Sequence, residues 1–297
     1  MAGIIDSIVN KYNYVIHDLA DPRTQEWWGV SNPFVVISIV SSYLYFCKSL
    51  GPRLMENRKP FELKTILMVY NFFQVCFSMF LVYEGYVYVF SKEYSFACEP
   101  VDFSQDPRAL RIAAGTWFYY VAKLTELLDT VFFVLRKKYK QVSFLHVYHH
   151  TLMSLVIWIG VKYFPGGHTI FMGFLNSMVH VIMYTYYLIS GFGPEYQKYL
   201  WWKKHVTLIQ LVQFVLIFIH NASVFFYECN YPKIINVLCL LNATLFINLF
   251  GKFYIKSYTK KSKNKASLET RKRPSLTNKV KNDDNIDAKR KIDEKSR

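Results

Sequence analysis

The sequence predicts an all-α polytopic membrane protein with seven transmembrane helices. Hydrophobic residues make up 52% of its 297 residues and aromatic residues 18%, whereas only 19% are charged. The charges stand in short runs between long apolar tracts, which is typical of helical membrane proteins rather than soluble ones. Each tract is near the ~20 residues that cross a bilayer. The tracts are residues 33–49, 65–90, 113–135, 144–163, 168–190, 206–226 and 234–255.

Residues 1–30 precede the first span and form a lead-in. Ile4, Ile8 and Tyr12 recur at helical spacing, so part of this segment is predicted to be an amphipathic helix. The segment ends at Trp27 and Trp28, a residue type that favours membrane interfaces. Three aspartates interrupt it, so it lacks the continuous apolar core of a cleavable signal peptide.

The loops between the spans alternate in charge. The first, third and fifth loops are rich in lysine and arginine, whereas the second, fourth and sixth are poorer or balanced by acidic residues. By the positive-inside rule, the odd loops and the C-terminus are cytosolic and the N-terminus is lumenal. The basic residues are Arg53, Arg58, Lys59 and Lys64 in the first loop, Arg136, Lys137, Lys138 and Lys140 in the third, and Lys198, Lys203 and Lys204 in the fifth.

A polar tail, residues 257–297, follows the seven-helix domain of residues 31–256. It holds fourteen Lys and Arg against six Asp and Glu, with few apolar residues, and is predicted to be disordered and cytosolic. The net charge of +15 lies mostly in this tail or beside the spans. It therefore indicates membrane topology and contact with lipid, and we expect no nucleic-acid partner.

Two of the five cysteines lie in predicted lumenal loops. Cys98 is in the second loop and Cys229 in the sixth. An oxidising lumen permits a disulfide between them, which we predict; two free thiols are the alternative. Cys47, Cys76 and Cys239 lie in apolar spans, where cysteine behaves as a small hydrophobic residue.

Three histidines open the fourth span. His146, His149 and His150 are related as i, i+3 and i+4, so their rings share one helix face. Ionisable groups in a membrane segment usually have a function. The alternative is a helix end at which ordinary histidines meet lipid headgroups.

The third span carries charges at helical spacing. Lys123, Glu126 and Asp129 are each three residues apart, so neighbouring side chains can pair along one side. Lys123 and Glu126 are equally well explained as a structural ion pair. Asp129 lies nearer the cytosolic end and is the better candidate to orient a histidine.

The fifth span carries one polar stripe. Asn176, His180, Met183, Tyr184 and Tyr187 follow one another at helical intervals. A single buried histidine is often only a core group with its hydrogen bonds satisfied. Because this one is aligned with an amide and two phenols, a functional role is favoured.

The polar groups of four spans are predicted to meet in the cytosolic half. His180 is about ten residues from the cytosolic end of its span, roughly 15 Å, and Gln210 begins the sixth span on the same side. The lumenal half is nearly all apolar and could line a pocket for a long hydrocarbon. An amphiphile with an anionic head, held by the basic loops, would suit such a chamber.

Two chemistries compete for a histidine box. Membrane di-iron desaturases and hydroxylases bind iron through many histidines, but this chain has eight in all and no second paired box. In the other chemistry, imidazole acts as a nucleophile or proton carrier on an acyl group. A non-catalytic lipid carrier is the third reading.

Four motifs resemble those of the fatty-acid elongase (ELO) family, the condensing enzymes of very-long-chain fatty-acid synthesis. The resemblance extends over residues 20–256, and Leu50–Lys64 and Gly193–Lys204 are similar to animal elongases of long saturated and monounsaturated chains. In order, the four motifs are Lys123–Thr130, Gln141–His150, Asn176–Tyr187 and Thr207–Phe214.

The resemblance implies seven spans, six of them forming a barrel around an acyl tunnel, in the endoplasmic-reticulum membrane. It implies condensation of a long-chain acyl-CoA with malonyl-CoA to a 3-oxoacyl-CoA, CO2 and CoA, without metal or other cofactor. His149 would carry the acyl group as an acyl-imidazole, and His180 would act on the malonyl unit. His146 and His150 would orient the box, supported by Lys123, Glu126 and Asp129.

Binding residues follow from the same resemblance. Asn176, Tyr187 and Gln210 are candidates for the thioester and carboxylate groups of the substrates. The charges of Arg136, Lys137, Lys203 and Lys204 suit the phosphates of CoA. Docking with the other enzymes of the elongation cycle, and homo- or hetero-oligomers, stay open.

Two positions depart from the family pattern. Ser154 stands where relatives often have proline, so the fourth span is expected to be straighter. His205 stands where an aromatic residue is usual.

Overall fold

The computed structural model describes residues 2–259, and within that range it contains helices, turns and loops but no strand. The predicted all-α class is confirmed. The α-helices are α1 (Ala2–Asn13), α2 (Pro33–Tyr45), α3 (Gly51–Met55), α4 (Lys64–Val89), α5 (Pro107–Thr125), α6 (Leu128–Leu135), α7 (Phe144–Tyr163), α8 (Ile170–Phe192), α9 (Lys203–Ser223) and α10 (Lys233–Tyr254).

The chain divides into two compact units, Met1–Ile247 and Asn248–Arg297. The first holds every site discussed below. Of the second, the structure describes the end of α10 and a π-helical turn, Ile255–Thr259. The predicted disordered tail lies, from residue 260 onward, outside the described residues.

Within the described residues, five helical segments are long and apolar enough to cross a membrane, so the chain is a multi-pass membrane protein. They are Pro33–Met55, Lys64–Val89, Phe144–Tyr163, Lys198–Phe226 and Lys233–Tyr258. The predicted spans 113–135 and 168–190 are not among them. The first is broken between α5 and α6, and the second, α8, is diluted by Asn176, His180 and several tyrosines.

The ends of the helices follow local sequence rules. Asn32 caps α2, because its side-chain oxygen accepts a hydrogen bond from Phe34 N at 2.8 Å, and Pro33 takes the first helical position. Ser143 caps α7 in the same way, accepting from His146 N at 3.3 Å. The histidine box therefore begins at the first turn of a helix whose start is fixed by its own cap.

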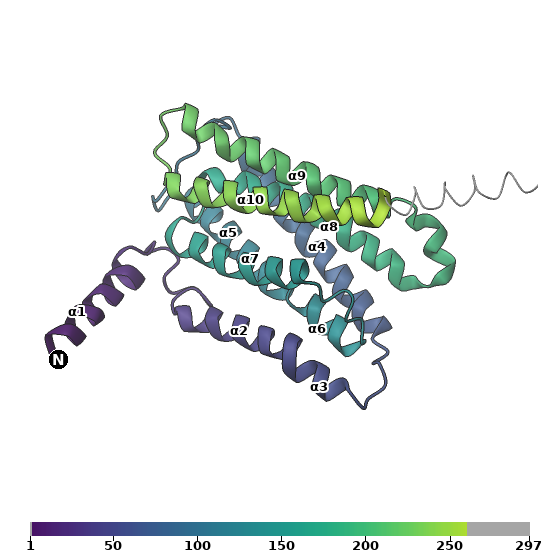
Figure 1. The fold of residues 1–297 in the computed structure, drawn as a ribbon. Coiled ribbons are helices and arrows are strands. Elements are labelled where there is room, and N and C mark those ends of the chain that lie inside the picture. The colour runs from purple at the N-terminus through teal and green to yellow at the C-terminus, as the bar shows by residue number, and fades with distance from the viewer. Residues whose placement is uncertain (1, 260–297) are drawn as a thin grey trace, which may run out of the picture. The chain divides into compact units, whose positions relative to one another are not determined.

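Packing joins helices that are distant in the sequence. The most extensive contact is between α4 and α8, and α7 packs against both α5 and α2 (Figure 1). A Cβ atom at Gly85 would lie 2.9 Å from the ring of Phe174, so glycine lets α4 approach α8 closely. Tyr88, Val89 and Tyr94 pack with Phe174 in a buried cluster beside this contact.

The lead-in has two parts. Helix α1 stands apart from the other helices in Figure 1, and its apolar residues Ile4 and Ile8 are 67% and 63% exposed. By contrast, Asp21 and Arg23 form a buried ion pair at 2.6 Å, and Arg23 also donates to the carbonyl of Asp102. The second half of the lead-in is therefore fixed to the loops at one end of the bundle, whereas α1 is not.

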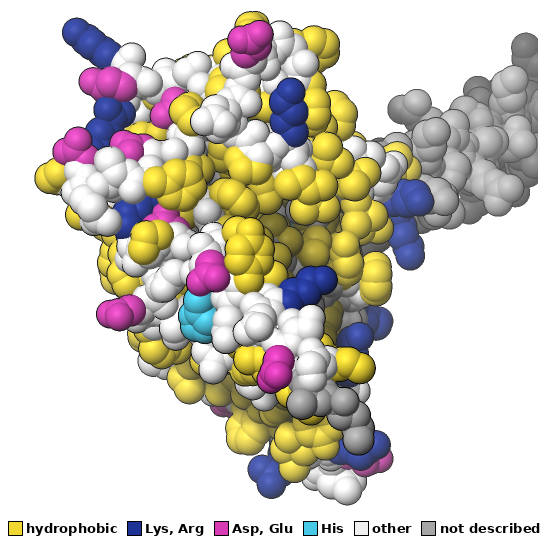
Figure 2. Space-filling model, turned by 90° about the vertical axis from the view of Figure 1, so that its left-hand side faces the viewer, with side chains coloured by type: hydrophobic (Ala, Val, Ile, Leu, Met, Phe, Trp, Pro, Cys, Tyr) yellow, Lys and Arg dark blue, Asp and Glu magenta, His cyan; other side chains and the backbone are white. Residues whose placement is uncertain are grey.

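A disulfide joins Cys98 to Cys229, with an S–S distance of 2.02 Å. This is the pairing that the sequence predicted. We call the end of the bundle that carries it the disulfide end (residues 90–106, 164–169 and 224–232), and the opposite end the basic end (residues 56–63, 136–143 and 193–202). Figure 2 looks onto the disulfide end, where hydrophobic side chains surround a hollow.

Removal of the disulfide should destabilise the protein. The bridge closes a loop of 131 residues, and its loss typically costs about 2–4 kcal/mol. We expect the double variant Cys98→Ser/Cys229→Ser to have a lower Tm in detergent, measured by tryptophan fluorescence. Cys76→Ser, which removes an exposed free thiol, is the control and should leave Tm unchanged. Equal Tm values for the double variant and the control would show that the bridge adds no stability.

Candidate active site

A tight turn at Glu126 and Leu127 separates α5 from α6. Asp129 N bonds to the carbonyl of Glu126 at 3.1 Å, three residues back rather than four. The carbonyl of Thr125 instead accepts from the hydroxyl of Tyr70 at 3.3 Å. Such i−3 bonds tighten a helix locally and often mark functional positions. The bend lies in the segment that the sequence predicted as one continuous span.

The bend presents a charged network to α8. The Glu126 carboxylate oxygen Oε1 accepts from Lys123 Nζ at 2.7 Å and lies 3.1 Å from His180 Nδ1. Lys123 Nζ also donates to Asn176 Oδ1 at 2.7 Å. All four side chains are buried. Lys123 and Glu126 thus form the ion pair expected from their spacing, and the pair also holds two polar residues of the fifth predicted span.

Glu126 fixes the proton position on His180. An ionised carboxylate only accepts hydrogen bonds, so the ring nitrogen facing it, Nδ1, carries a proton. Nε2 is then the nitrogen that can exchange a proton with a substrate. The sequence suggested that Asp129 orients a histidine, but the carboxylate that contacts His180 is that of Glu126. Asp129 Oδ2 instead accepts a hydrogen bond from the hydroxyl of Tyr184 at 2.8 Å.

The three box histidines differ in their surroundings. His146 Nε2 lies 3.0 Å from the hydroxyl of Thr130, which in turn lies 2.8 Å from that of Tyr43. The rings of His146 and His150 make an edge contact with centroids 4.4 Å apart. His149 has a buried Nδ1 without a hydrogen-bond partner among the described residues. His146 is thus held by a hydrogen bond, whereas His149 keeps an unengaged nitrogen among the described residues.

His149 lines a small cavity together with Asn176. The volume of this inner cavity is about 20 Å³, room for about one water molecule. Met153 and Met172 narrow it, and Gln213 reaches it from α9. Because Asn176 also belongs to the Lys123 network, the unengaged histidine and the charged network meet at one cavity.

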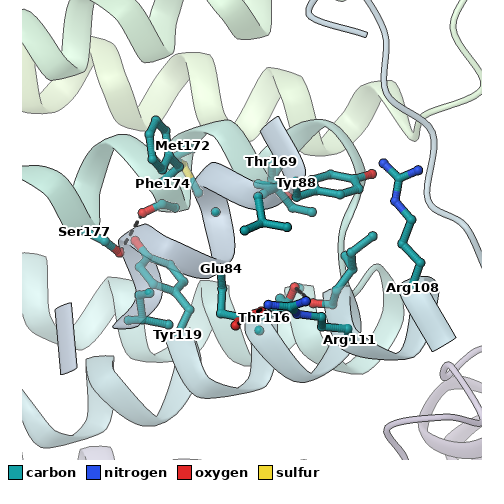
Figure 3. A pocket seen from close by; sticks show the side chains of 18 of the residues that line it. Glu84, Tyr88, Arg108, Arg111, Thr116, Tyr119, Thr169, Met172, Phe174 and Ser177 are labelled. Atoms are coloured by element: carbon teal, nitrogen blue, oxygen red, sulfur yellow. Dashed lines mark hydrogen bonds and ion pairs between the residues drawn. The ribbon is translucent and has the colours of Figure 1, made fainter. Parts of the chain in front are cut away.

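A second, larger cavity lies nearer the disulfide end. This distal cavity has a volume of about 550 Å³ between α4, α5, α7 and α8, and it shares Tyr119 and Met172 with the inner cavity. Figure 3 shows Tyr119 and Ser177 at one side of it and Arg108 at the other. The cavity wall includes Glu84 and Arg111, which contradicts the expectation of a nearly apolar half. Glu84 lies inside the predicted span 65–90 and was not among the predicted site residues.

The remaining predicted site residues lie farther from this network. Gln210 Nε2 contacts Met183 Sδ at 3.7 Å, and Tyr187 is 39% exposed, with its ring 6.0 Å from that of Tyr184. Lys137 Nζ donates to the carbonyl of Glu56 at 3.0 Å. None of these three residues lines the inner or the distal cavity. Arg136 and Lys137 follow α6, whereas Lys203 and Lys204 begin α9 and are exposed.

Two residues at the cavity were not among the predicted site residues. Tyr119 donates to Asn176 Oδ1 at 2.9 Å and lies four residues before Lys123 on the same face of α5. Gln213 lines the inner cavity and lies three residues after Gln210. Helical spacing from the predicted residues would have found both.

Other proteins with the same motifs identify the family. Residues 28–266 match the family described as ELO: GNS1/SUR4 family. The chain belongs to this family. It is 50% identical over 254 residues to very long chain fatty acid elongase 7 of Rattus norvegicus, covering 85% of this chain and 90% of the relative. It is 49% identical over 252 residues to elongase 7 of Drosophila melanogaster (84% and 77%), and 45% identical over 275 residues to elongase 1 of Homo sapiens (92% and 98%).

The family match gives no support to the alternative of a di-iron desaturase or hydroxylase. Its ligand set also has no counterpart in the described part of the chain, where no three His, Cys, Asp or Glu side chains are grouped to hold a metal ion. The ELO motifs and the helical network instead account for the same histidines.

The Lys123–Glu126 pair should be strongly coupled. Both side chains are at most 4% exposed, and removal of one partner from a buried pair costs about 3–5 kcal/mol, because the other charge is left uncompensated. We expect Lys123→Met and Glu126→Gln each to lower the free energy of unfolding by about this amount. The double variant should lose much less than the sum, as measured by thermal unfolding in a double-mutant cycle. Additive losses would mean that the pair is not coupled.

Proposed function

We propose that this protein is a very-long-chain fatty-acid elongase that condenses a long-chain acyl-CoA with malonyl-CoA to give a 3-oxoacyl-CoA, CO2 and CoA. Its relatives are very long chain fatty acid elongases, which supports the reaction class. The observation that carries the proposal is that His149, with an unengaged buried nitrogen, lines the same cavity as Asn176, whose network holds His180.

In the first step, an imidazole nitrogen of His149 attacks the carbonyl carbon of the acyl thioester. The C–S bond breaks, and CoA leaves as a thiolate that takes up the imidazole proton. The product is an acyl-imidazole, which is a reactive acyl donor. His146 and His150 hold the turn that carries His149, through Thr130 and through their own ring contact.

In the second step, malonyl-CoA loses CO2, and the electron pair left on its methylene carbon attacks the acyl carbonyl carbon. The C–N bond breaks, and the leaving imidazole nitrogen takes up a proton from water, which restores neutral His149. We assign His180 to this step, because Glu126 stabilises the protonated ring and leaves Nε2 to donate to the thioester oxygen on which negative charge develops. Lys123 holds Glu126 in place for this role. Neither step requires a metal or organic cofactor.

The substrates fit the two ends of the site. The acyl chain runs from His149 past Tyr119 and Met172 into the distal cavity. Methionine side chains are flexible, so Met172 can widen the narrow passage. Asn176, Tyr187 and Gln210 remain our candidates for the thioester and carboxylate groups. The CoA phosphates are assigned by charge alone to Arg136, Lys137, Lys203 and Lys204.

We also propose seven spans, six of them in a barrel around the acyl path, in the endoplasmic-reticulum membrane. The two spans beyond the five apolar ones are α5 with α6, and α8, whose polar residues face the site. The basic end would face the cytosol and the disulfide end the lumen, which agrees with the charge of the loops and with the bridge. An elongase in this membrane could also dock with the other enzymes of the elongation cycle and form homo- or hetero-oligomers, and both are part of the same proposal.

Mass spectrometry of the purified full chain tests the two-step mechanism. Incubation with a long-chain acyl-CoA and no malonyl-CoA should add the mass of the acyl group and release CoA, with the adduct on His149. His149→Ala should lose both adduct and condensation. His180→Ala should keep the adduct, while condensation falls by roughly 10²- to 10³-fold because a donor to the developing charge is lost.

Histidine removal elsewhere is the control. His17→Ala changes an exposed side chain of the lead-in and should retain adduct and turnover. Product formation by the wild-type protein without any adduct, and by His149→Ala at a near-normal rate, would refute the covalent route. Direct condensation in a ternary complex would then replace it.

A further inference from the structure

An ion pair stands in the wall of the distal cavity. The Arg111 guanidinium binds the Glu84 carboxylate through two hydrogen bonds, Nε–Oε2 at 2.7 Å and Nη2–Oε1 at 2.9 Å. Both residues line the distal cavity, and Figure 3 shows the pair at its wall. Arg111 also lies over the ring of Tyr83, 5.8 Å from its centre. A bidentate pair held on an aromatic ring is a fixed feature rather than two free chains.

The ion pair stands at a defined depth. Arg111 is twelve residues before Lys123 on α5, which places it about 18 Å along the helix from the catalytic network. Between the two, the cavity wall is mainly apolar, with Leu81, Ile112 and Phe174 among its residues. Beyond Glu84, a second pair joins Arg108 to Glu93 at 2.7 Å. The apolar path thus gives way to charge over a short distance.

Glycines keep the path open up to that point. A Cβ atom at Gly160 on α7 would meet no atom within 4 Å, and one at Gly115 would meet only the Cβ of Glu84, at 4.0 Å. Both glycines line the distal cavity. A side chain at either position therefore starts in open space at the cavity wall.

We infer that the Glu84–Arg111 pair sets the longest acyl chain that this protein accepts, with Gly160 keeping the last part of the path clear. The inference rests on the proposed function. A methylene group that passes the pair gains no apolar contact, whereas one that stops before it does. Each buried methylene is worth about fourfold in binding, so a boundary of this kind gives a sharp limit to chain length.

Two variants move the boundary in opposite directions. Glu84→Leu/Arg111→Leu removes both charges and extends the apolar path, so kcat/KM for an acyl-CoA two carbons beyond the wild-type limit should rise about tenfold. Gly160→Leu fills the path, so kcat/KM for the longest wild-type substrate should fall at least about tenfold. Shorter acyl-CoAs should react as before with both variants.

Two controls separate charge and bulk from general damage. The exchanged pair Glu84→Arg/Arg111→Glu keeps an ion pair and should keep the wild-type chain-length profile. Gly251→Leu adds the same bulk to another helical glycine without atoms within 4 Å, outside the cavity wall, and should also keep it. Leucine favours a helix more than glycine does, so neither glycine variant is expected to disturb folding.

The assay combines turnover with binding. Condensation is measured for a series of acyl-CoAs with radiolabelled malonyl-CoA, and the rise in Tm on addition of each acyl-CoA alone reports binding. If Gly160→Leu and the double leucine variant condense acyl-CoAs at the wild-type rate and with the wild-type chain-length profile, the inference is overturned and the proposed function stands. Binding profiles that shift as expected, without any condensation, would refute the proposed function and support the boundary. If neither the turnover profile nor the binding profile shifts in these two variants, the inference is overturned whether or not the protein catalyses condensation.

Discussion

A lysine and a carboxylate that are buried together join the site to the fold. Lys123 lies in the last turn of α5 and Glu126 in the turn that follows it, and the pair reaches across to Asn176 and His180 on α8. Buried charges are tolerated only where their hydrogen bonds are satisfied. A shift of α5 against α8 would therefore break the bond from Lys123 to Asn176 and the contact of Glu126 with His180, and the same contact fixes the orientation of His180.

The bend is what makes this network possible. In a continuous helix, the carbonyl of Thr125 would bond to the backbone four residues on, but here it accepts from Tyr70 of α4. The side chain of Gln74 adds a second link from α4, donating to Thr125 Oγ1 at 3.2 Å. Backbone that leaves the helical pattern in a membrane is tolerated where other helices satisfy it. The cost of the bend is thus met by α4, the helix that also packs most closely on α8.

The sequence was informative where function depends on helical spacing, and less so where it depends on contacts between helices. The shared face of the box histidines and the Lys123–Glu126 pair follow from intervals along one helix. The partner of Asp129 does not, because Tyr184 lies on another helix, and spacing along one helix does not show which side chains of another helix it meets. The pairing of Glu84 was missed for the same reason, because a single acidic residue in an apolar tract does not indicate that an arginine on another helix, α5, will pair with it.

The two ion pairs along α5 show how burial decides what a charge can do. Lys123 and Glu126 are 3% and 4% exposed, whereas Arg111 is 48% exposed and Glu84 17%. An exposed ion pair such as Glu84–Arg111 contributes little to stability. Stability of the fold alone therefore does not explain why this ion pair lies in the wall of an otherwise apolar cavity. Its effect on a hydrocarbon is independent of that, because a methylene group gains nothing from lying against solvated charge. One pair thus holds the fold around the reacting groups, and the other marks where the apolar path stops.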